Sequence, residues 1–123
     1  MSGDMAAWGQ MEKKAIDLAV EEVNKAGGVL GKPVKVFSYD DKGDKVEAVN
    51  VAKKLVSQDK VCVIIGENTS SASMAVAPVL EEAKVPAIAT AATNPKVTEP
   101  EPGKVRPYYF RVCFIDPFQG RAI

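Results

Sequence analysis

The five residues from Val61 to Ile65 constrain the fold more than any other stretch of this sequence. All five are apolar, and four of them are β-branched. A short, continuously apolar run of this kind is typical of a strand in a parallel sheet that is covered on both faces. We therefore predict that Val61 to Ile65 forms a central, buried strand of an α/β domain.

Helical periodicity appears on both sides of that run. Apolar residues at steps of three and four predict one buried helical stripe from Trp8 to Ala26 and a second from Ala48 to Val56. Asp44 precedes the second stripe at a spacing typical of a helix cap. A third helix is predicted over Met74 to Ala83, where Pro78 should introduce a kink or remove a hydrogen bond.

Three further short apolar runs predict strands, at Pro33 to Tyr39, Val85 to Ala89 and Tyr108 to Val112. A surface loop is expected over Lys96 to Pro107, and Asp116 with the proline after it is predicted to open a last helix. The alternation predicts a doubly wound, flavodoxin-like parallel sheet. In such folds a strand normally precedes the first helix, so we expect the first strand to be missing from this chain.

Length and composition narrow the classes of function. A chain of 123 residues is expected to form one domain, residues 1–123. Its 16 basic and 16 acidic residues balance, so nucleic acid is not expected as a partner. With no histidine and no paired-cysteine motif, neither a zinc site nor any other cofactor is predicted, and Cys62 and Cys113 are expected to be two buried free thiols. We find neither a membrane span nor a signal peptide in the sequence.

Three segments are expected at the edge of the sheet where ligands bind in open parallel folds, beyond the carboxyl ends of the strands. They are Ser2 to Trp8, Gly66 to Ser73, and Thr90 to Pro95. The last two are rich in small and hydroxyl side chains, which suit a carboxylate group. The alternative interpretation is that the hydroxyls at Thr69 to Ser71 only cap a helix.

Several ordered motifs across the chain carry a resemblance to a known family. They are Gly3-x-x-x-x-Trp8-Gly9, Asn24-x-x-Gly27-Gly28-Val29-x-Gly31, Tyr39-Asp40-Asp41, Gly66-x-x-x-Ser70-Ser71 and Ala92-Thr93-Asn94-Pro95. In order and spacing they resemble the amino-terminal lobe of type I periplasmic binding proteins, particularly the branched-chain amino-acid (leucine/isoleucine/valine) binders of ABC transport systems. The resemblance implies two lobes that close on an amino acid, so this chain would be one incomplete lobe without a first strand, hinge or second lobe.

The same resemblance implies roles for individual residues. The hydroxyls of Ser70 and Thr93, with the Thr93 amide, would hold the ligand carboxylate, while the Ala91 carbonyl and the Thr93 hydroxyl would accept from its ammonium group. Ala92 would contribute backbone.

Three more residues complete the implied ligand-binding set: Trp8, Asn68 and Thr69. Trp8 would line the side-chain pocket, although periodicity equally allows it to be the first core residue of its helix. Asn68 occupies a position where an apolar pocket contact can occur, so an aliphatic preference is not assured. In close family members a disulfide joins the positions of Gly43 and Thr69, and neither residue is a cysteine here.

Two hypotheses from different classes follow. The first is a non-catalytic lobe that binds an amino acid for an ABC transporter permease, in the periplasm or extracellular and lipid-anchored in the full-length protein. The second is a cytosolic sensor or regulator lobe of the same fold that binds an amide or amino acid. An enzyme is a distant third hypothesis because nothing pairs a nucleophile with a base. Unpaired sheet edges lead us to expect self-association, and the missing lobe leads us to expect weak amino-acid affinity.

Overall fold

Three short parallel strands lie side by side in the computed structural model, which describes residues 2–3 and 5–122. The strands are β1 (Ile64–Ile65), β2 (Ala87–Ala89) and β3 (Tyr109–Arg111), in the order β1-β2-β3. Their register places Ile64 opposite Ala87, and Ala87 opposite Tyr109. The predicted parallel α/β architecture is therefore confirmed, although the strands are shorter than the apolar runs that predicted them.

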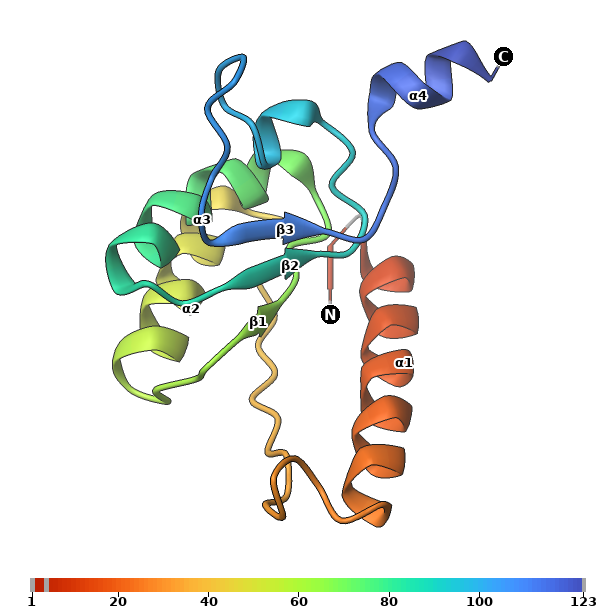
Figure 1. Cartoon of the computed structure of the whole chain (residues 1–123), viewed down its shortest axis with the longest axis vertical. Helices are drawn as coiled ribbons and strands as arrows, with labels where there is room; N and C mark the ends of the chain where they lie inside the picture. The colour runs from red at the N-terminus through yellow and green to blue at the C-terminus, as the bar shows by residue number, and fades with distance from the viewer. Residues whose placement is uncertain (1, 4, 123) are drawn as a thin grey trace.

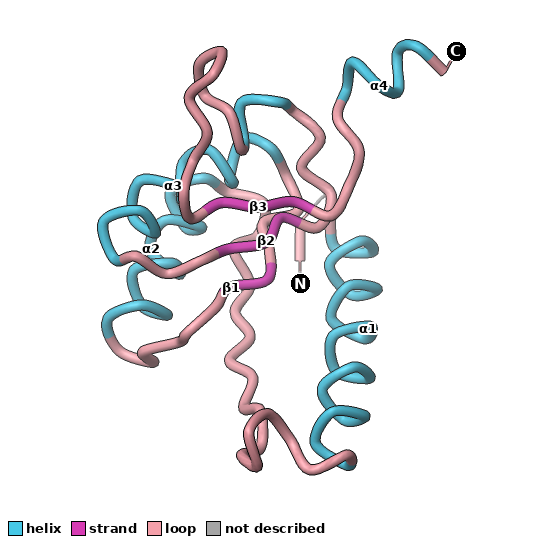
Figure 2. The backbone as a smooth tube through the Cα atoms, in the orientation of Figure 1, coloured by secondary structure: helices cyan, strands magenta, loops and turns pink. Residues whose placement is uncertain are grey.

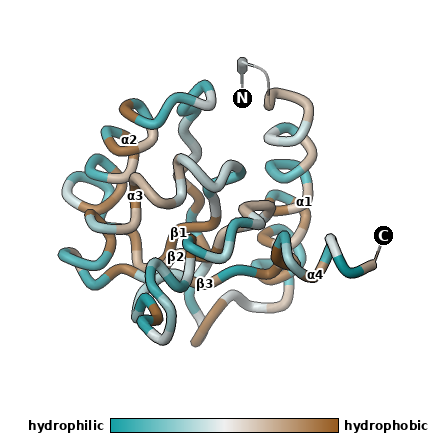
Figure 3. The backbone as a smooth tube through the Cα atoms, turned by 90° about the horizontal axis from the view of Figure 1, so that it is seen from above, coloured by the Kyte–Doolittle hydropathy of each residue, from teal (hydrophilic) through white to brown (hydrophobic). Residues whose placement is uncertain are grey.

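Helices lie on both sides of this sheet. α2 (Lys45–Ser57) and α3 (Ser70–Ala83) cover one face, and α1 (Ala6–Lys25) stands on the other side, separated from the strands in both views (Figures 1 and 3). The 3-10 turn η1 (Pro95–Val97) follows β2, and α4 (Asp116–Arg121) points away from the body of the molecule (Figure 2). No helix in the described ranges is long and apolar enough to cross a membrane.

Local signals explain where the two packed helices begin and end. The Asp44 carboxylate accepts hydrogen bonds from the backbone N–H groups of Val46 and Glu47, so the predicted cap of α2 is confirmed. α3 ends at Ala83, and Lys84 after it takes the left-handed conformation common after helices. Pro78 lies inside α3, and the helix continues across it although proline offers no N–H to the turn before it.

The hydrophobic core lies between α2, α3 and the sheet. Leu80 and Val76 of α3 are fully buried there, together with Tyr109 of β3 and Ala87 of β2. Val97 of η1 is also fully buried, so the stretch predicted as a surface loop, Lys96 to Pro107, contains a residue of the core. Small side chains on α2 and α3 allow the two helices to pack closely against each other.

The predicted buried stripe on α1 is wrong. Trp8, Met11 and Leu18 are 55%, 58% and 57% exposed, and Gly9 is the only buried residue of this helix. Helical periodicity predicted the secondary structure correctly, but a buried stripe also needs a partner surface. Within the described residues, nothing packs tightly against α1.

Two strand predictions also fail for the same reason. The segment from Pro33 to Tyr39 is extended but pairs with no strand of the described residues. The run from Val61 to Ile65 contributes only β1, which is an edge strand rather than the predicted central one, and Ile65 is 50% exposed. The segment from Pro33 to Tyr39 and β1 each have an unpaired backbone edge, and no described strand lies between them.

The prediction of two buried thiols is half wrong. Both cysteines are free, as expected, but Cys62 is exposed on the run that leads into β1. Cys113 is partly buried, and its thiol donates a weak hydrogen bond to the Ala92 carbonyl, with the sulfur 3.5 Å from the oxygen. Cys62 precedes β1 and lines the cavity between α1 and the sheet, so no neighbouring element covers it.

Candidate functional site

Two loops meet at the carboxyl ends of β1 and β2. One loop leads from β1 into α3, and the other follows β2 toward η1. The Asn94 backbone N–H donates a hydrogen bond to the Ser70 hydroxyl oxygen across the junction, with a nitrogen-to-oxygen distance of 3.2 Å. Two of the three segments predicted to form the ligand-binding edge are therefore brought together.

The amino terminus of α3 opens at this junction. Thr69 has extended backbone and its hydroxyl oxygen accepts a hydrogen bond from the Ala72 N–H at 3.3 Å, so Thr69 is the cap of the helix. The capping interpretation is confirmed for Thr69. Ser70 is the first helical residue, and since its oxygen accepts from Asn94, its own proton remains available to an acceptor. Free N–H groups in the first turn add to the preference for an anion.

Arg111, at the end of β3, shapes the second loop. One nitrogen of its guanidinium group donates to the carbonyl oxygens of Ala92 and Asn94, each at 3.0 Å. The other donates to the Pro95 carbonyl oxygen at 3.0 Å and to the Thr98 hydroxyl oxygen at 2.7 Å. Four acceptors held by one planar group give this loop a defined backbone shape.

The chain after β3 supports the loop from the other side. The Val112 N–H donates to the Ala89 carbonyl oxygen at 3.2 Å, and the Asp116 N–H donates to the Thr93 carbonyl oxygen at 3.1 Å. Ala92 is fully buried, whereas Ala91 and Thr93 are only partly buried. The loop is thus anchored at Ala92 while its neighbours remain partly accessible.

The carboxyl group of Glu67, in the loop after β1, lies against that of Asp41. Burial raises the pKa of Glu67 to about 8, with further contributions from a hydrogen bond with Asp41 and from the charges of Asp41 and Glu12. Because its pKa is raised to about 8, Glu67 is largely protonated at neutral pH. The neighbouring Asp40 carboxyl group has its pKa lowered instead, chiefly by a hydrogen bond from the Ser2 side chain and also by one from the Lys42 N–H.

Hydroxyl groups, a helix amino terminus and partly accessible backbone suit reversible capture of a small carboxylate. No cluster of three or more metal-ligating side chains occurs among the residues that the structure describes.

Comparison with known proteins identifies the family. The model of the family described as "Periplasmic binding protein" matches residues 1–121. The chain belongs to this family. An amino acid binding protein of Pseudomonas aeruginosa is 35% identical over 119 residues, which are 97% of this chain and 31% of that protein.

Solved structures of periplasmic binding proteins agree with the fold. A leucine binding protein of Thermotoga maritima is 43% identical, with a TM-score of 0.86 over 99% of this chain and 33% of that one. The branched-chain amino acid transporter substrate binding protein of Streptococcus pneumoniae, solved in complex with isoleucine, is 38% identical. Its TM-score is also 0.86, over 94% of this chain and 32% of that one. The chain thus spans about a third of the length of the proteins it matches.

The structure places most of the predicted periplasmic-binding-protein site residues at the junction. Ser70 lies at the start of α3 beside Thr69, and Ala91, Ala92 and Thr93 lie on the facing loop. Their contacts to a ligand stay predictions.

Trp8 and Asn68, the remaining two predicted site residues, lie on α1 and on the cavity beside it. Trp8 is on the first turns of α1 and is 55% exposed, so the alternative that it belongs to the core is wrong and its pocket role stays a prediction. Neither polar atom of the buried Asn68 amide has a hydrogen-bond partner within the described part of the chain. Asn68 lies beside Glu67 on the cavity that α1 and β1 enclose.

Sequence reasoning missed Arg111 and Glu67. An arginine at the end of a predicted apolar strand was a signal that its charge must be satisfied by nearby acceptors, but the sequence does not say which ones. The burial of Glu67 depends on how Asp41 and Glu12 approach it from two other segments. Neither approach follows from spacing along the chain.

Proposed function

We propose that this chain binds an amino acid reversibly, without making or breaking a covalent bond, at the junction of the loops after β1 and β2. The observation that carries the proposal is the Asn94-to-Ser70 hydrogen bond of 3.2 Å, which joins the two hydroxyl-rich loops at the amino terminus of α3. The named ligands of the relatives, leucine and isoleucine, support a branched-chain amino acid.

Each group of the ligand has a proposed partner. The Ser70 hydroxyl donates its remaining proton to the carboxylate, which also accepts from the hydroxyl and the N–H of Thr93. The Ala91 carbonyl oxygen and the Thr93 hydroxyl oxygen accept from the ammonium group, and Ala92 contributes backbone. Arg111 does not contact the ligand in this proposal, but its hydrogen bonds hold the loop that does.

We extend the proposal to transport, by the names of the relatives. The ligand is captured outside the cytoplasm, in the periplasm or on a lipid-anchored protein, and passed to the permease of an ABC transporter. A second lobe closes over the ligand in this proposal. A site that is open on one side leaves much of the ligand in water, so the chain alone should bind weakly.

A nuclear magnetic resonance titration tests the proposal. Isoleucine added at millimolar concentrations to the isotope-labelled 123-residue chain should shift the amide signals of Ser70 and Thr93 progressively. The amine that lacks the carboxylate, 2-methylbutylamine, is the matched control and should shift them much less. Ser70→Ala should weaken the isoleucine response several-fold.

Two results would contradict the proposal. One is a response to isoleucine that is confined to residues away from the two loops. The other is an equal response to the amine, since the carboxylate would then contribute nothing. Calorimetric binding in the micromolar range by this chain alone would overturn the part of the proposal that assigns ligand enclosure to a second lobe.

A further inference from the structure

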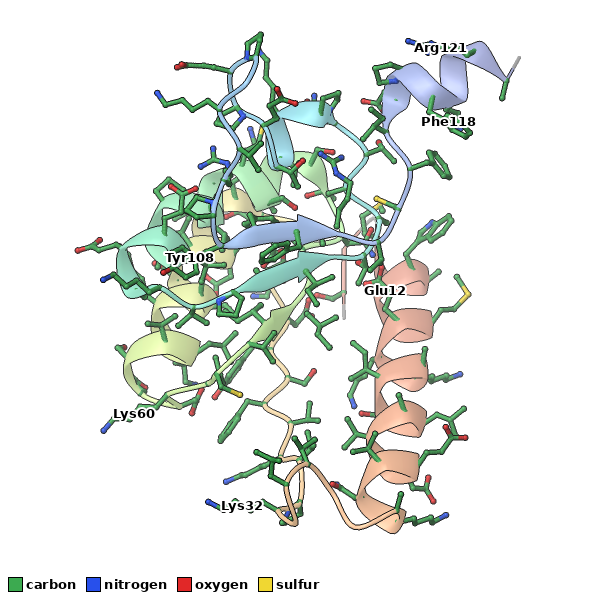
Figure 4. All side chains as sticks on the ribbon, in the orientation of Figure 1. Glu12, Lys32, Lys60, Tyr108, Phe118 and Arg121 are labelled. Atoms are coloured by element: carbon green, nitrogen blue, oxygen red, sulfur yellow. The ribbon has the colours of Figure 1, made fainter. Side chains whose placement is uncertain are left out.

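Three carboxyl groups from three separate segments converge beside the loop junction. Glu12 comes from α1, Asp41 from the turn before α2, and Glu67 from the loop after β1, and all three line the cavity between α1 and the sheet. Figure 4 shows Glu12 near the carboxyl ends of the strands, at the opposite end from Lys60. The Glu67 carboxyl group is hydrogen-bonded to that of Asp41 and lies within reach of the charge of Glu12.

The other charged side chains around this cluster do not neutralise it. Lys13 is nearby on α1, but its ammonium group is paired with a carboxylate of the same helix at 2.6 Å. Lys35 and Lys60 line the cavity from its other end. Asp40 adds negative charge, since hydrogen bonds, chiefly one from the Ser2 side chain, lower its pKa. Carboxyl groups this close, with no basic group offsetting the charge at Glu67 in the described part of the chain, cannot all be ionised, so one keeps a proton.

Asp41 is held in place independently of Glu67. Its carboxylate accepts a hydrogen bond from the Gly43 N–H at 3.2 Å, and its carbonyl oxygen accepts one from the Asp44 N–H at 2.9 Å. On the other side of the turn, a side-chain carbon added at Gly3 would come within 2.5 Å of the Lys42 carbonyl oxygen, so the two backbones are in close contact. The carboxyl group of Asp41 is therefore a fixed point for its partner.

The sheet side of Glu67 carries no further titrating group near neutral pH. The buried Tyr109 hydroxyl lies against the Glu67 backbone and the Ser73 side chain. Burial is the main cause that raises the pKa of Tyr109 above its ordinary value, so this hydroxyl stays neutral. Arg106, which also acts on Tyr109, is paired with the Glu81 carboxylate at 2.7 Å. The proton of the cluster is therefore held between the carboxyl groups.

The position of Glu67 in the chain links this proton to the amino-acid site. Glu67 is followed within three residues by Thr69, the cap of α3, and by Ser70, the first helical residue. A protonated Glu67 donates to the Asp41 carboxylate and ties the loop to the fixed turn. Once the proton is lost, two adjacent carboxylates repel each other, and the loop loses that attachment.

We propose that Glu67 is a positioning residue of the amino-acid site: its protonated carboxyl group, bonded to Asp41, holds the loop that carries Thr69 and Ser70, and loss of the proton releases this loop and weakens amino-acid binding. The inference rests on the proposed function, because it concerns the site at the loop junction. Glu67 does not contact the ligand and acts through Ser70. Amino-acid binding is therefore linked to proton binding, and the ligand in turn strengthens the hold of Glu67 on its proton.

A titration without ligand tests the link between the proton and the loop. Carbon-detected nuclear magnetic resonance of the full 123-residue chain is followed from pH 6 to pH 10. The signals of Thr69 and Ser70 should move with one midpoint near pH 8, the pKa of Glu67. Glu67→Gln should abolish this midpoint, because an amide keeps a hydrogen-bond donor but does not ionise. Glu82→Gln, at an exposed glutamate of α3, is the matched control and should retain it.

Two results of this titration would overturn the proposal. One is the absence of a midpoint near pH 8 at Thr69 and Ser70 in the unaltered chain. The other is a midpoint that persists in Glu67→Gln, since the loop would then respond to a different group. Circular dichroism at both ends of the pH range confirms that each variant is folded.

Binding of isoleucine at pH 6.5 and pH 9 tests the effect on affinity. The affinity of the unaltered chain should fall at least threefold at pH 9 and at most about tenfold, because about a tenth of the chain keeps the proton one pH unit above the pKa. Glu67→Gln should remove this fall. Glu67→Leu, which fills similar space without a hydrogen bond, should bind more weakly at both pH values. The small loss of the ammonium proton of isoleucine at pH 9 is common to all variants and is measured with Glu82→Gln.

Failure of this inference and failure of the proposed function give different results. If isoleucine shifts neither loop at either pH, the proposed function fails, and with it the role of Glu67 in amino-acid binding. If isoleucine binds at the two loops but the pH-dependent fall exceeds that of Glu67→Gln by less than threefold, the proposed function stands and the positioning role of Glu67 is overturned.

Discussion

The two sides of the sheet differ in how completely they are packed. On one side α2 and α3 bury Leu80, Val76 and the ring of Tyr109 against the strands. On the other side α1 has the same kind of apolar periodicity, yet Leu18 remains 57% exposed and a cavity of about 440 Å³ lies between helix and sheet. The contrast shows that an amphipathic pattern specifies a helix, whereas burial requires a complementary surface.

The packed side and the open side of the sheet also carry different kinds of surface. The packed side positions the loop junction, because α3 begins there and Arg111 of β3 holds the facing loop. The open side has free backbone edges and an apolar groove. Preorganised polar groups therefore favour a small ligand on the packed side.

The largest expected effect tests the packing contrast directly. Leu80→Ala should lower the free energy of unfolding by about 3 kcal/mol, because it removes a fully buried side chain and leaves a cavity. Leu18→Ala on α1 should change it by less than about 0.5 kcal/mol. Urea denaturation followed by circular dichroism measures both. Equal losses would mean that α1 is packed in solution as tightly as α3.

A smaller loss is expected when the loop junction is disturbed from the packed side. Arg111→Met should lower the free energy of unfolding by about 2 kcal/mol, because several carbonyl oxygens lose their donor. Arg121→Met, at the exposed end of α4, is the control and should have no effect. Thermal denaturation compares the two. The role assigned to Arg111 is wrong if both variants melt at the same temperature.

A pH-dependent effect is expected beside the groove, at Glu67. Its pKa is about 8 in the folded chain against an ordinary 4.5, so the folded state binds the proton more tightly. Glu67 therefore lowers the free energy of unfolding as pH rises from about 4.5 to 8. Glu67→Gln should raise stability at pH 8 by on the order of 1–2 kcal/mol, since water still reaches part of the group, and should change little at pH 4.

Urea denaturation at the two pH values checks this prediction. Glu82→Gln is the matched control, because Glu82 is exposed on α3. A stabilisation by Glu67→Gln that is equal at both pH values would show that the effect does not arise from the proton.

The smallest expected effect concerns the cap of α2. Asp44→Ala should lower the free energy of unfolding by about 1 kcal/mol, because two N–H groups lose their acceptor. The exposed neighbour provides the comparison, and Lys45→Ala should be close to neutral. Chemical denaturation again gives both values. A loss of the same size for Lys45→Ala would show that the effect does not come from the hydrogen bonds of the Asp44 cap.

Prediction from the sequence succeeded where the determining interactions are local. The cap at Asp44, the helix predicted over Met74 to Ala83 and the strand near Ala87 follow from side-chain type and spacing. The meeting of the loops after β1 and β2 was also predicted, because parallel strands end at one edge. Prediction failed for the buried stripe of α1 and for the strand over Pro33 to Tyr39, since both depend on a neighbouring strand that the described chain does not contain.

The sequence by itself determined the helices, the parallel α/β class and the hydroxyl-rich segments at the edge of the sheet, because these depend on periodicity and on short-range hydrogen bonding. Only the tertiary structure decided that Arg111 braces the second loop, that Glu67 is protonated near neutral pH, and that β1 keeps a free edge. Each of these depends on groups from separate segments that approach one another in space. Spacing along the chain does not encode such approaches residue by residue, since they result from the packing of the whole domain.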